Sequence, residues 1–126
     1  MIRMAAICLM VMPLAGTAGA ECLTANQPGT AEGRLSSITF YDLAGRPEPA
    51  LILELKTPAC LTGPDKDYDN VEASKRIHLY ATERAVEQKL KKALGKIVQV
   101  TGSPFGEETV HHHAPIVMHV DAVTVR

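Results

Sequence analysis

Apolar and polar residues alternate in several short segments of this 126-residue chain, as they do in β-strands that bury one face. In residues 51–56 leucines occupy every second position, and in residues 76–80 Ile77 and Leu79 do the same. β-Branched and aromatic residues are frequent in the other segments, as is typical of strands. Five strands are predicted, at residues 33–41, 51–56, 76–80, 96–102 and 116–125.

Breaks in the alternation indicate where strands should bend or end. In the first segment Leu35 falls on one parity and Phe40 on the other, which predicts a bulge at Ser36-Ser37. Thr57-Pro58 is expected to end the second strand, and Gly102-Ser103-Pro104 is expected to turn the chain after the fourth.

The segment 83–94 has the periodicity of a helix instead. Its apolar residues recur at intervals of three and four between Val86 and Leu94, which forms one stripe along a helix. Thr82 is expected to cap the start, and Gly95 to follow the end in a left-handed conformation.

This order of elements predicts a mainly β fold with one helix. Five short strands with a helix between strands three and four is the connection order of the OB-fold, a small five-stranded barrel. An SH3-like barrel, or a flat sheet with a packed helix, fits the same pattern and stays open.

The first twenty residues have the composition of a signal peptide. Arg3 supplies a positive start, residues 4–15 are uncharged and apolar, and Ala18-Gly19-Ala20 matches a small-x-small cleavage site. The apolar run is shorter than the ~20 residues that cross a membrane. We therefore expect a removed signal peptide at 1–20, a single domain at 21–126, no membrane span, and a periplasmic or secreted location.

Charge and cysteine content narrow the function further. The chain has 13 Lys and Arg against 14 Asp and Glu and no Trp, so nucleic acid, which usually requires a basic surface with stacking aromatics, is not expected as a partner. Cys22 and Cys60 remain after signal removal, and an even pair in an oxidising compartment predicts a disulfide. Among sequence motifs, neither CxxC nor Cys/His spacing supports a catalytic thiol.

Histidines near the C-terminus are the main candidates for chemistry. His111 and His113 would share one face of an extended chain, and so would His119 and Asp121. About 20 Å of extended chain separates the two pairs, so one ion can use only one of them, with a further ligand from another element. Zn, Cu or Ni would suit such ligands. The alternative is that these histidines are solvated or structural, with no cofactor.

Other motifs carry little chemistry. Residues 65–70 (DKDYDN) imitate the start of an EF-hand calcium loop, but Asn70 stands where the loop requires Gly and Arg76 where it requires Glu. A solvated acidic loop is therefore expected. Nucleophile-elbow, P-loop and dinucleotide-binding motifs are absent from the sequence, and no catalytic residue is assigned.

Four segments together resemble an uncharacterised family of small exported bacterial proteins, known as a domain of unknown function. They are residues 32–35 (EGRL), 58–60 (PAC), 94–102 (LGKIVQVTG) and 111–117 (HHHAPIV). The resemblance rests on a Gly-Lys-x-Val-x-Val-x-Gly strand and a His-His-x-Pro segment, and it implies an exported OB-like barrel. It singles out His112, His113 and Pro115, whereas Ala114 departs from the small polar residue expected there.

The fold and these residues predict a non-catalytic binding module for a protein, glycan or small anion. OB-type barrels bind ligands on the face of strands two and three. The predicted contact residues on that face are Glu54, Lys56, Arg76, His78 and Tyr80. The alternative is a periplasmic transition-metal-binding protein that uses His111 and His113, and an enzyme of unrecognised type is the third hypothesis.

Overall fold

Six strands and one helix make up the described part of the chain, residues 22–126 of a computed structural model. The predicted signal peptide lies outside the described residues. The elements are β1 (Leu23–Thr24), β2 (Gly29–Tyr41), β3 (Pro47–Thr62), β4 (Val71–Tyr80), α1 (Arg84–Lys92), β5 (Ile97–Gly106) and β6 (Ile116–Val125).

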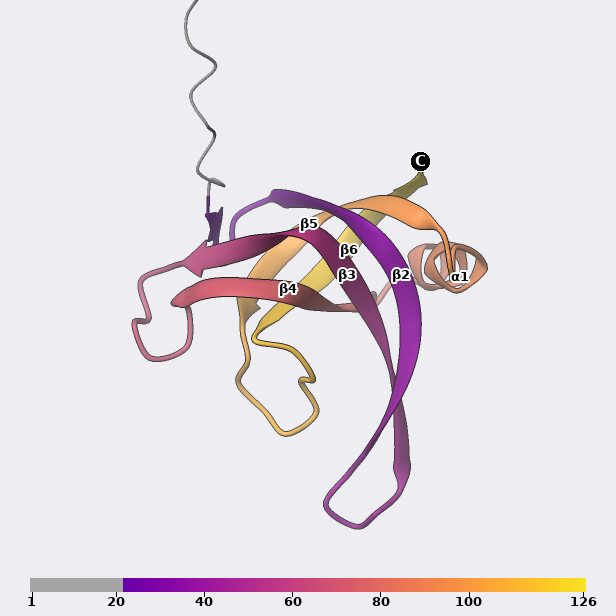
Figure 1. Ribbon diagram of the computed structural model, residues 1–126, viewed down its shortest axis with the longest axis horizontal. Helices are drawn as coiled ribbons and strands as arrows, with labels where there is room; N and C mark the ends of the chain where they lie inside the picture. Colours follow the sequence, from indigo (N-terminus) through magenta and orange to yellow (C-terminus); the bar gives the residue numbers. More distant parts are fainter. Residues whose placement is uncertain (1–21) are drawn as a thin grey trace, which may run out of the picture.

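The strands close into a β-barrel, which confirms the predicted fold class (Figure 1). Their order is β1-β3-β2-β5-β6-β4, and a further β3–β4 pairing closes the five long strands into a ring. The helix follows the fourth strand rather than the third, because the two-residue β1 precedes the five long strands. Among the long strands alone, the helix stands where the OB-fold order predicts it.

The long strands near the predicted breaks run further than expected. β3 continues through Thr57-Pro58, where register shifts against β4 let the strand bend and Pro58 remains exposed. β5 continues through Gly102-Ser103-Pro104, with an irregularity at Thr101/Gly102. The carbonyl of Pro104 accepts a hydrogen bond from the N–H of Asn26, so its backbone points away from β6 and the ladder loses no donor.

The predicted bulge in β2 is wrong. The β2–β3 register is unbroken from Gly33 to Tyr41. Leu35 is fully buried in the barrel interior, whereas Ile38 and Phe40 lie on the opposite side of the strand and are half-buried there. The change of parity therefore reflects a strand that packs on both faces.

The barrel interior is filled by aliphatic side chains from every long strand, and α1 covers one end with Val86 and Leu90. Glu83, not Thr82, occupies the N-cap position of the helix, and its side chain makes no capping hydrogen bond. Gly95 has a φ of +83° as predicted, and its N–H donates to the carbonyl of Leu35.

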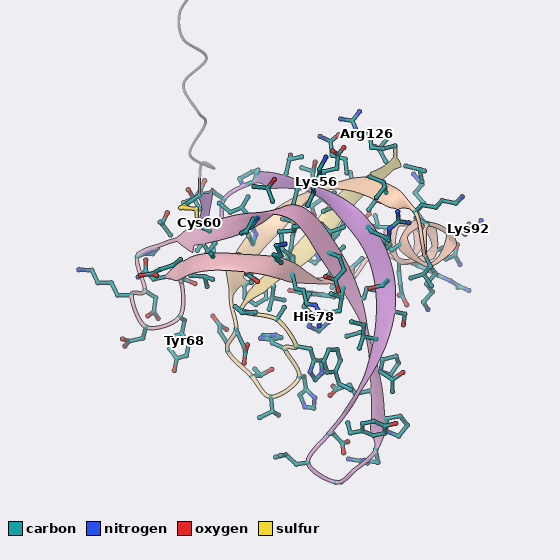
Figure 2. The ribbon with its side chains drawn as sticks, viewed as in Figure 1. Lys56, Cys60, Tyr68, His78, Lys92 and Arg126 are labelled. Carbon is teal, nitrogen blue, oxygen red and sulfur yellow. A yellow bond between two sulfur atoms is a disulfide. The ribbon has the colours of Figure 1, made fainter. Side chains whose placement is uncertain are left out.

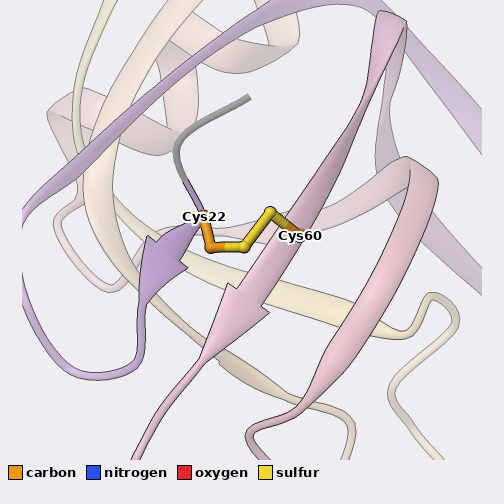
Figure 3. Close-up of a disulfide and its surroundings, with 2 residues drawn as sticks. All are labelled: Cys22 and Cys60. Carbon is orange, nitrogen blue, oxygen red and sulfur yellow. A yellow bond between two sulfur atoms is a disulfide. The ribbon is translucent and has the colours of Figure 1, made fainter. Parts of the chain in front are cut away.

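The predicted disulfide between Cys22 and Cys60 is present (Figure 3). It fastens β1 beside the end of β3, where Leu23 is in register with Leu61 in a parallel pairing. Within residues 22–126, none of the helical structure is both long and apolar enough to cross a membrane.

Candidate ligand-binding face

The loop between β5 and β6, residues 107–115, extends from the barrel on the same side as the β2–β3 hairpin (Figure 1); we call it the histidine loop. It is bonded to Glu48 of β3 and His78 of β4. Ile52 and Val117 are both 0% exposed although they do not belong to the interior cluster. Ala114 of the loop is buried as well. A second, smaller packed layer therefore lies outside the barrel wall.

Aromatic and imidazole rings form a continuous chain across this face. Neighbouring ring centroids are 4.1–6.3 Å apart. The tightest pair is Phe40 with His113, whose rings are stacked with an interplanar angle of 4°. The order of the rings is Phe40, His113, His78, His112, Phe105, Tyr80 and His119.

A carboxylate from β3 holds the histidine loop to the barrel. His111 Nδ1 donates to Glu48 Oε1 at 2.5 Å, and His113 Nε2 donates to Glu48 Oε2 at 3.1 Å. The side chain of His113 is only 10% exposed. Glu48 thus binds two alternate histidines of the loop, one with each oxygen.

Backbone donors fix two more imidazoles of the face. The N–H of His113 donates to His78 Nδ1 at 3.1 Å, so the proton of neutral His78 is on Nε2. The N–H groups of Glu108 and Thr109 donate to His112 Nδ1 at 3.0 and 3.3 Å. These bonds require an unprotonated Nδ1 on both rings.

The electrostatics of the face agree with these bonds. Burial, followed by the nearby charges of His113 and His112, lowers the pKa of His78 to about 4. Burial, with a smaller contribution from Glu108, raises the pKa of Tyr80. Desolvation alone would raise the pKa of Glu48, but hydrogen bonds from the two histidines and their charges together outweigh it and lower that pKa.

An open groove of about 600 Å³ adjoins the ring chain, between α1, the start of β3 and the end of β4. Most of its lining is apolar, and Glu87 and Lys91 of α1 form an ion pair of 2.9 Å within it. The lining residues are Ser37, Pro49, Ala50, Leu51, His78, Leu79, Tyr80, Ala81, Glu87, Lys91 and Leu94. Mostly apolar concave surfaces with a few polar groups are typical of ligand sites.

The segment that carries most of this face also matches a known family model. Residues 76–124 match the model of a domain of unknown function, DUF4431. This confirms the predicted resemblance to an uncharacterised family. The DUF4431 match contains His78, Tyr80 and the whole histidine loop, whereas Phe40 and Glu48 lie outside it. No curated protein matches the chain.

The predicted contact residues are only partly brought together. His78 and Tyr80, within the DUF4431 segment, line the groove, and the histidine loop half-covers His78. Arg76 and Glu54 form an ion pair of 2.9 Å with each other across β3 and β4, outside the groove. Lys56, which is labelled in Figure 2, lines a separate hollow with residues from the start of β2.

The predicted metal ligands have other contacts. His111 and His113 bind Glu48, while His119 Nε2 is 2.9 Å from the Thr82 hydroxyl and its Nδ1 is 3.8 Å from Asp121. Throughout residues 22–126, three or more His, Cys, Asp or Glu side chains are nowhere grouped so as to hold a metal ion.

The imitation of a calcium loop has a structural explanation. Asp69 is only 5% exposed, and its Oδ1 accepts a hydrogen bond from the N–H of Gly106 at 3.3 Å. This carboxylate therefore joins the loop to the end of β5, so the expectation of a fully solvated loop is wrong at Asp69.

Sequence reasoning missed three residues of the face: Phe40, Glu48 and Phe105. The parity change at Phe40 was the available signal, because an apolar residue on the outer side of a strand needs a cover. Glu48 lies between the first two predicted strands, and nothing in its sequence neighbourhood points to the histidines 63 and 65 residues away.

Proposed function

We propose that the chain is an exported, non-catalytic binding module that receives an apolar group of a partner protein in the groove beside α1. The groove itself is the observation that carries this proposal: it is mostly apolar, open to solvent and large enough for one or two side chains. The disulfide is compatible with the export predicted from the first twenty residues.

His78 and Tyr80 supply the polar contacts of the proposed site. Because His78 Nδ1 accepts from the histidine loop, its Nε2–H is the donor left for a ligand. The low pKa of His78 keeps this ring neutral at physiological pH, so its Nε2–H is a donor without a charge. Tyr80, which is 38% exposed, adds an aromatic surface with a hydroxyl.

A pair of matched substitutions tests the groove. Leu94 lines it and is 41% exposed, whereas Leu43 lies in the β2–β3 turn and is 92% exposed. We expect Leu94→Glu to weaken binding of peptides selected from a random library by at least about tenfold, since an apolar contact is lost and a charge enters the groove. Leu43→Glu should leave the affinity unchanged, and equal affinities for both variants would refute the proposal.

Metal binding is the second candidate function. The observation that supports it is that His111 and His113 both contact Glu48. An ion bound by the two histidines would need a ligand from another element, and Glu48 of β3 could provide it. The ion would have to replace both hydrogen bonds, because these groups contact different oxygens of the carboxylate.

Thermal unfolding with Zn, Cu or Ni added, and with EDTA as the blank, tests this candidate. Metal binding predicts stabilisation that is lost in a His111→Ala/His113→Ala variant and that weakens below about pH 6, where imidazoles protonate. Melting temperatures that are the same with and without each ion would remove it.

A further inference from the structure

Half of β2 has a partner on one side only. β2 pairs with β3 from Gly33 to Tyr41, but its pairing with β5 covers only Gly29 to Arg34. Beyond that point the β2–β3 hairpin projects from the barrel, as Figure 1 shows. Among the described residues, no other strand is paired with residues 37–41 on the side away from β3.

The hydrogen bonds of Leu35 fix which residues face this open edge. Its N–H donates to the carbonyl of Lys96, and its carbonyl accepts from the N–H of Gly95, so both groups point away from β3. Backbone direction alternates along an antiparallel strand. Ser37, Thr39 and Tyr41 therefore also direct their N–H and C=O groups away from β3, and the side chains of all three are exposed.

We propose that the ligand of this module is an extended peptide segment of a partner protein, which adds as a strand to the Ser37–Tyr41 edge of β2. The proposal rests on the function proposed above and specifies how its ligand is held. Only another strand matches a row of alternating backbone donors and acceptors, and such addition is a common mode of peptide recognition.

The groove lies where it could bind side chains of the added strand. Ser37 and its cross-strand partner Leu51 both line the groove. The side chains of Ser37, Thr39 and Tyr41 share one face of β2, and this face therefore continues into the groove. Every second side chain of an added strand would face the groove. The peptide is therefore expected to be apolar at alternate positions.

The edge also lacks the features that normally prevent strand addition. Exposed edges are usually protected by lysine, proline or a bulge. Residues 36–41 (SSITFY) contain no charged residue and no proline, and their register against β3 is unbroken.

The first measurement is amide hydrogen exchange in the exported protein with its disulfide intact. Without peptide, the amides of Ser37, Thr39 and Tyr41 should exchange much faster than those of Ile38 and Phe40, which face β3. A peptide selected from a random library should slow exchange at the three edge amides by at least about tenfold, as expected for newly formed hydrogen bonds. Binding without such protection would overturn the proposal.

Two substitutions of Thr39 distinguish the contribution of its backbone N–H to peptide binding from that of its side chain. Thr39→Pro removes the outward N–H without removing a bond to β3, since proline is tolerated on strand edges. We expect it to weaken peptide binding at least about tenfold, while Thr39→Ala, which keeps the N–H, should bind like the wild type. Exchange data from the wild type do not depend on the folding of either variant.

The possible outcomes distinguish this proposal from the proposed function. Peptides that respond to Leu94→Glu but bind Thr39→Pro and Thr39→Ala equally would overturn strand addition and leave groove binding intact. If no selected peptide responds to either position, both fail. A dimer in sedimentation that Thr39→Pro dissociates would assign the edge to a second copy of the chain and overturn the peptide proposal.

Discussion

At the scale of single residues, His78 has the most unusual environment of the face. It is half-buried, its Nδ1 accepts from the backbone of His113, and the groups facing it are His112, His113 and Glu48. Each contact except that with Glu48 disfavours a positive charge on the ring. A neutral His78 is therefore a condition for the observed position of the histidine loop.

This residue predicts how stability depends on pH. The pKa of His78 is about 4 in the folded protein and near the ordinary 6.5 when unfolded, so the unfolded chain binds more protons between these values. Stability that is fully present above pH 6.5 should fall as the pH drops toward 4, by about 1 kcal/mol after allowance for solvent screening.

Chemical denaturation at pH 7 and pH 5 measures this dependence. In His78→Asn the amide oxygen replaces Nδ1 as the acceptor but does not titrate, so this part of the loss should disappear. An equal loss in the variant and the wild type would mean that other groups cause it.

Glu48 predicts the mobility of the histidine loop. Glu48→Gln removes the negative charge and replaces one acceptor oxygen by an NH2 donor, so one of the two histidines must change its tautomer or lose its bond. We expect the amide of His113, which is bonded to His78, to exchange several-fold faster with solvent. Glu54→Gln on the same strand is the control, and equal exchange rates in both variants would contradict the role assigned to Glu48.

At the scale of elements, the close approach of β2 to β3 depends on Gly33. A Cβ at Gly33 would lie 2.2 Å from the backbone oxygen of Glu54, whereas one at Gly45 would meet nothing within 4 Å. Gly33→Ala should force the strands apart and lower the free energy of unfolding by about 2–3 kcal/mol. Gly45→Ala, strained only by its φ of +78°, should cost about 1 kcal/mol. Urea denaturation measures both, and equal losses would refute the steric argument.

Sequence patterns predicted the helix and the long strands, but not where each strand ends. Period-two and period-3.6 patterns predicted all five long strands and the helix, because burial of one face sets both periods. Strand ends were missed wherever a proline or glycine stood at an irregularity in the pairing, as at Pro58 and Gly102. Proline ends a strand only where its missing N–H would have to donate a hydrogen bond to a neighbouring strand. Glycine ends one only where its conformational freedom falls inside regular strand pairing.

The site was harder to predict than the fold. His78 and Tyr80 were predicted as contact residues because polar residues on a strand mark its outer face, and both line the groove. The contact of Glu48 with His111 and His113 joins segments that are more than sixty residues apart, and no periodic pattern records it. Arg76 and Glu54 have the same pattern as His78 but bind each other, a difference that depends on register.

At the scale of the whole molecule, the two ends of the long β3 have separate tasks. Its first half forms the projecting hairpin with Glu48 and the groove residues, and its last residues hold the disulfide. Twelve residues along the strand separate Glu48 from Cys60, and Cys60 lies at the end of β3 away from the projecting hairpin (Figure 2). Covalent stabilisation and the proposed binding face are therefore far apart.

This separation predicts a loss of stability without a change at the face. In Cys22→Ser/Cys60→Ser the 38-residue crosslink is absent, and the chain-entropy model gives a loss of about 3–4 kcal/mol. The melting temperature should fall by at least about 10 °C. Below that temperature, exchange of the His113 amide and affinity for selected peptides should match the wild type, because every contact of the histidine loop and groove remains. Faster exchange of that amide in the folded variant would show that the disulfide also orders the face.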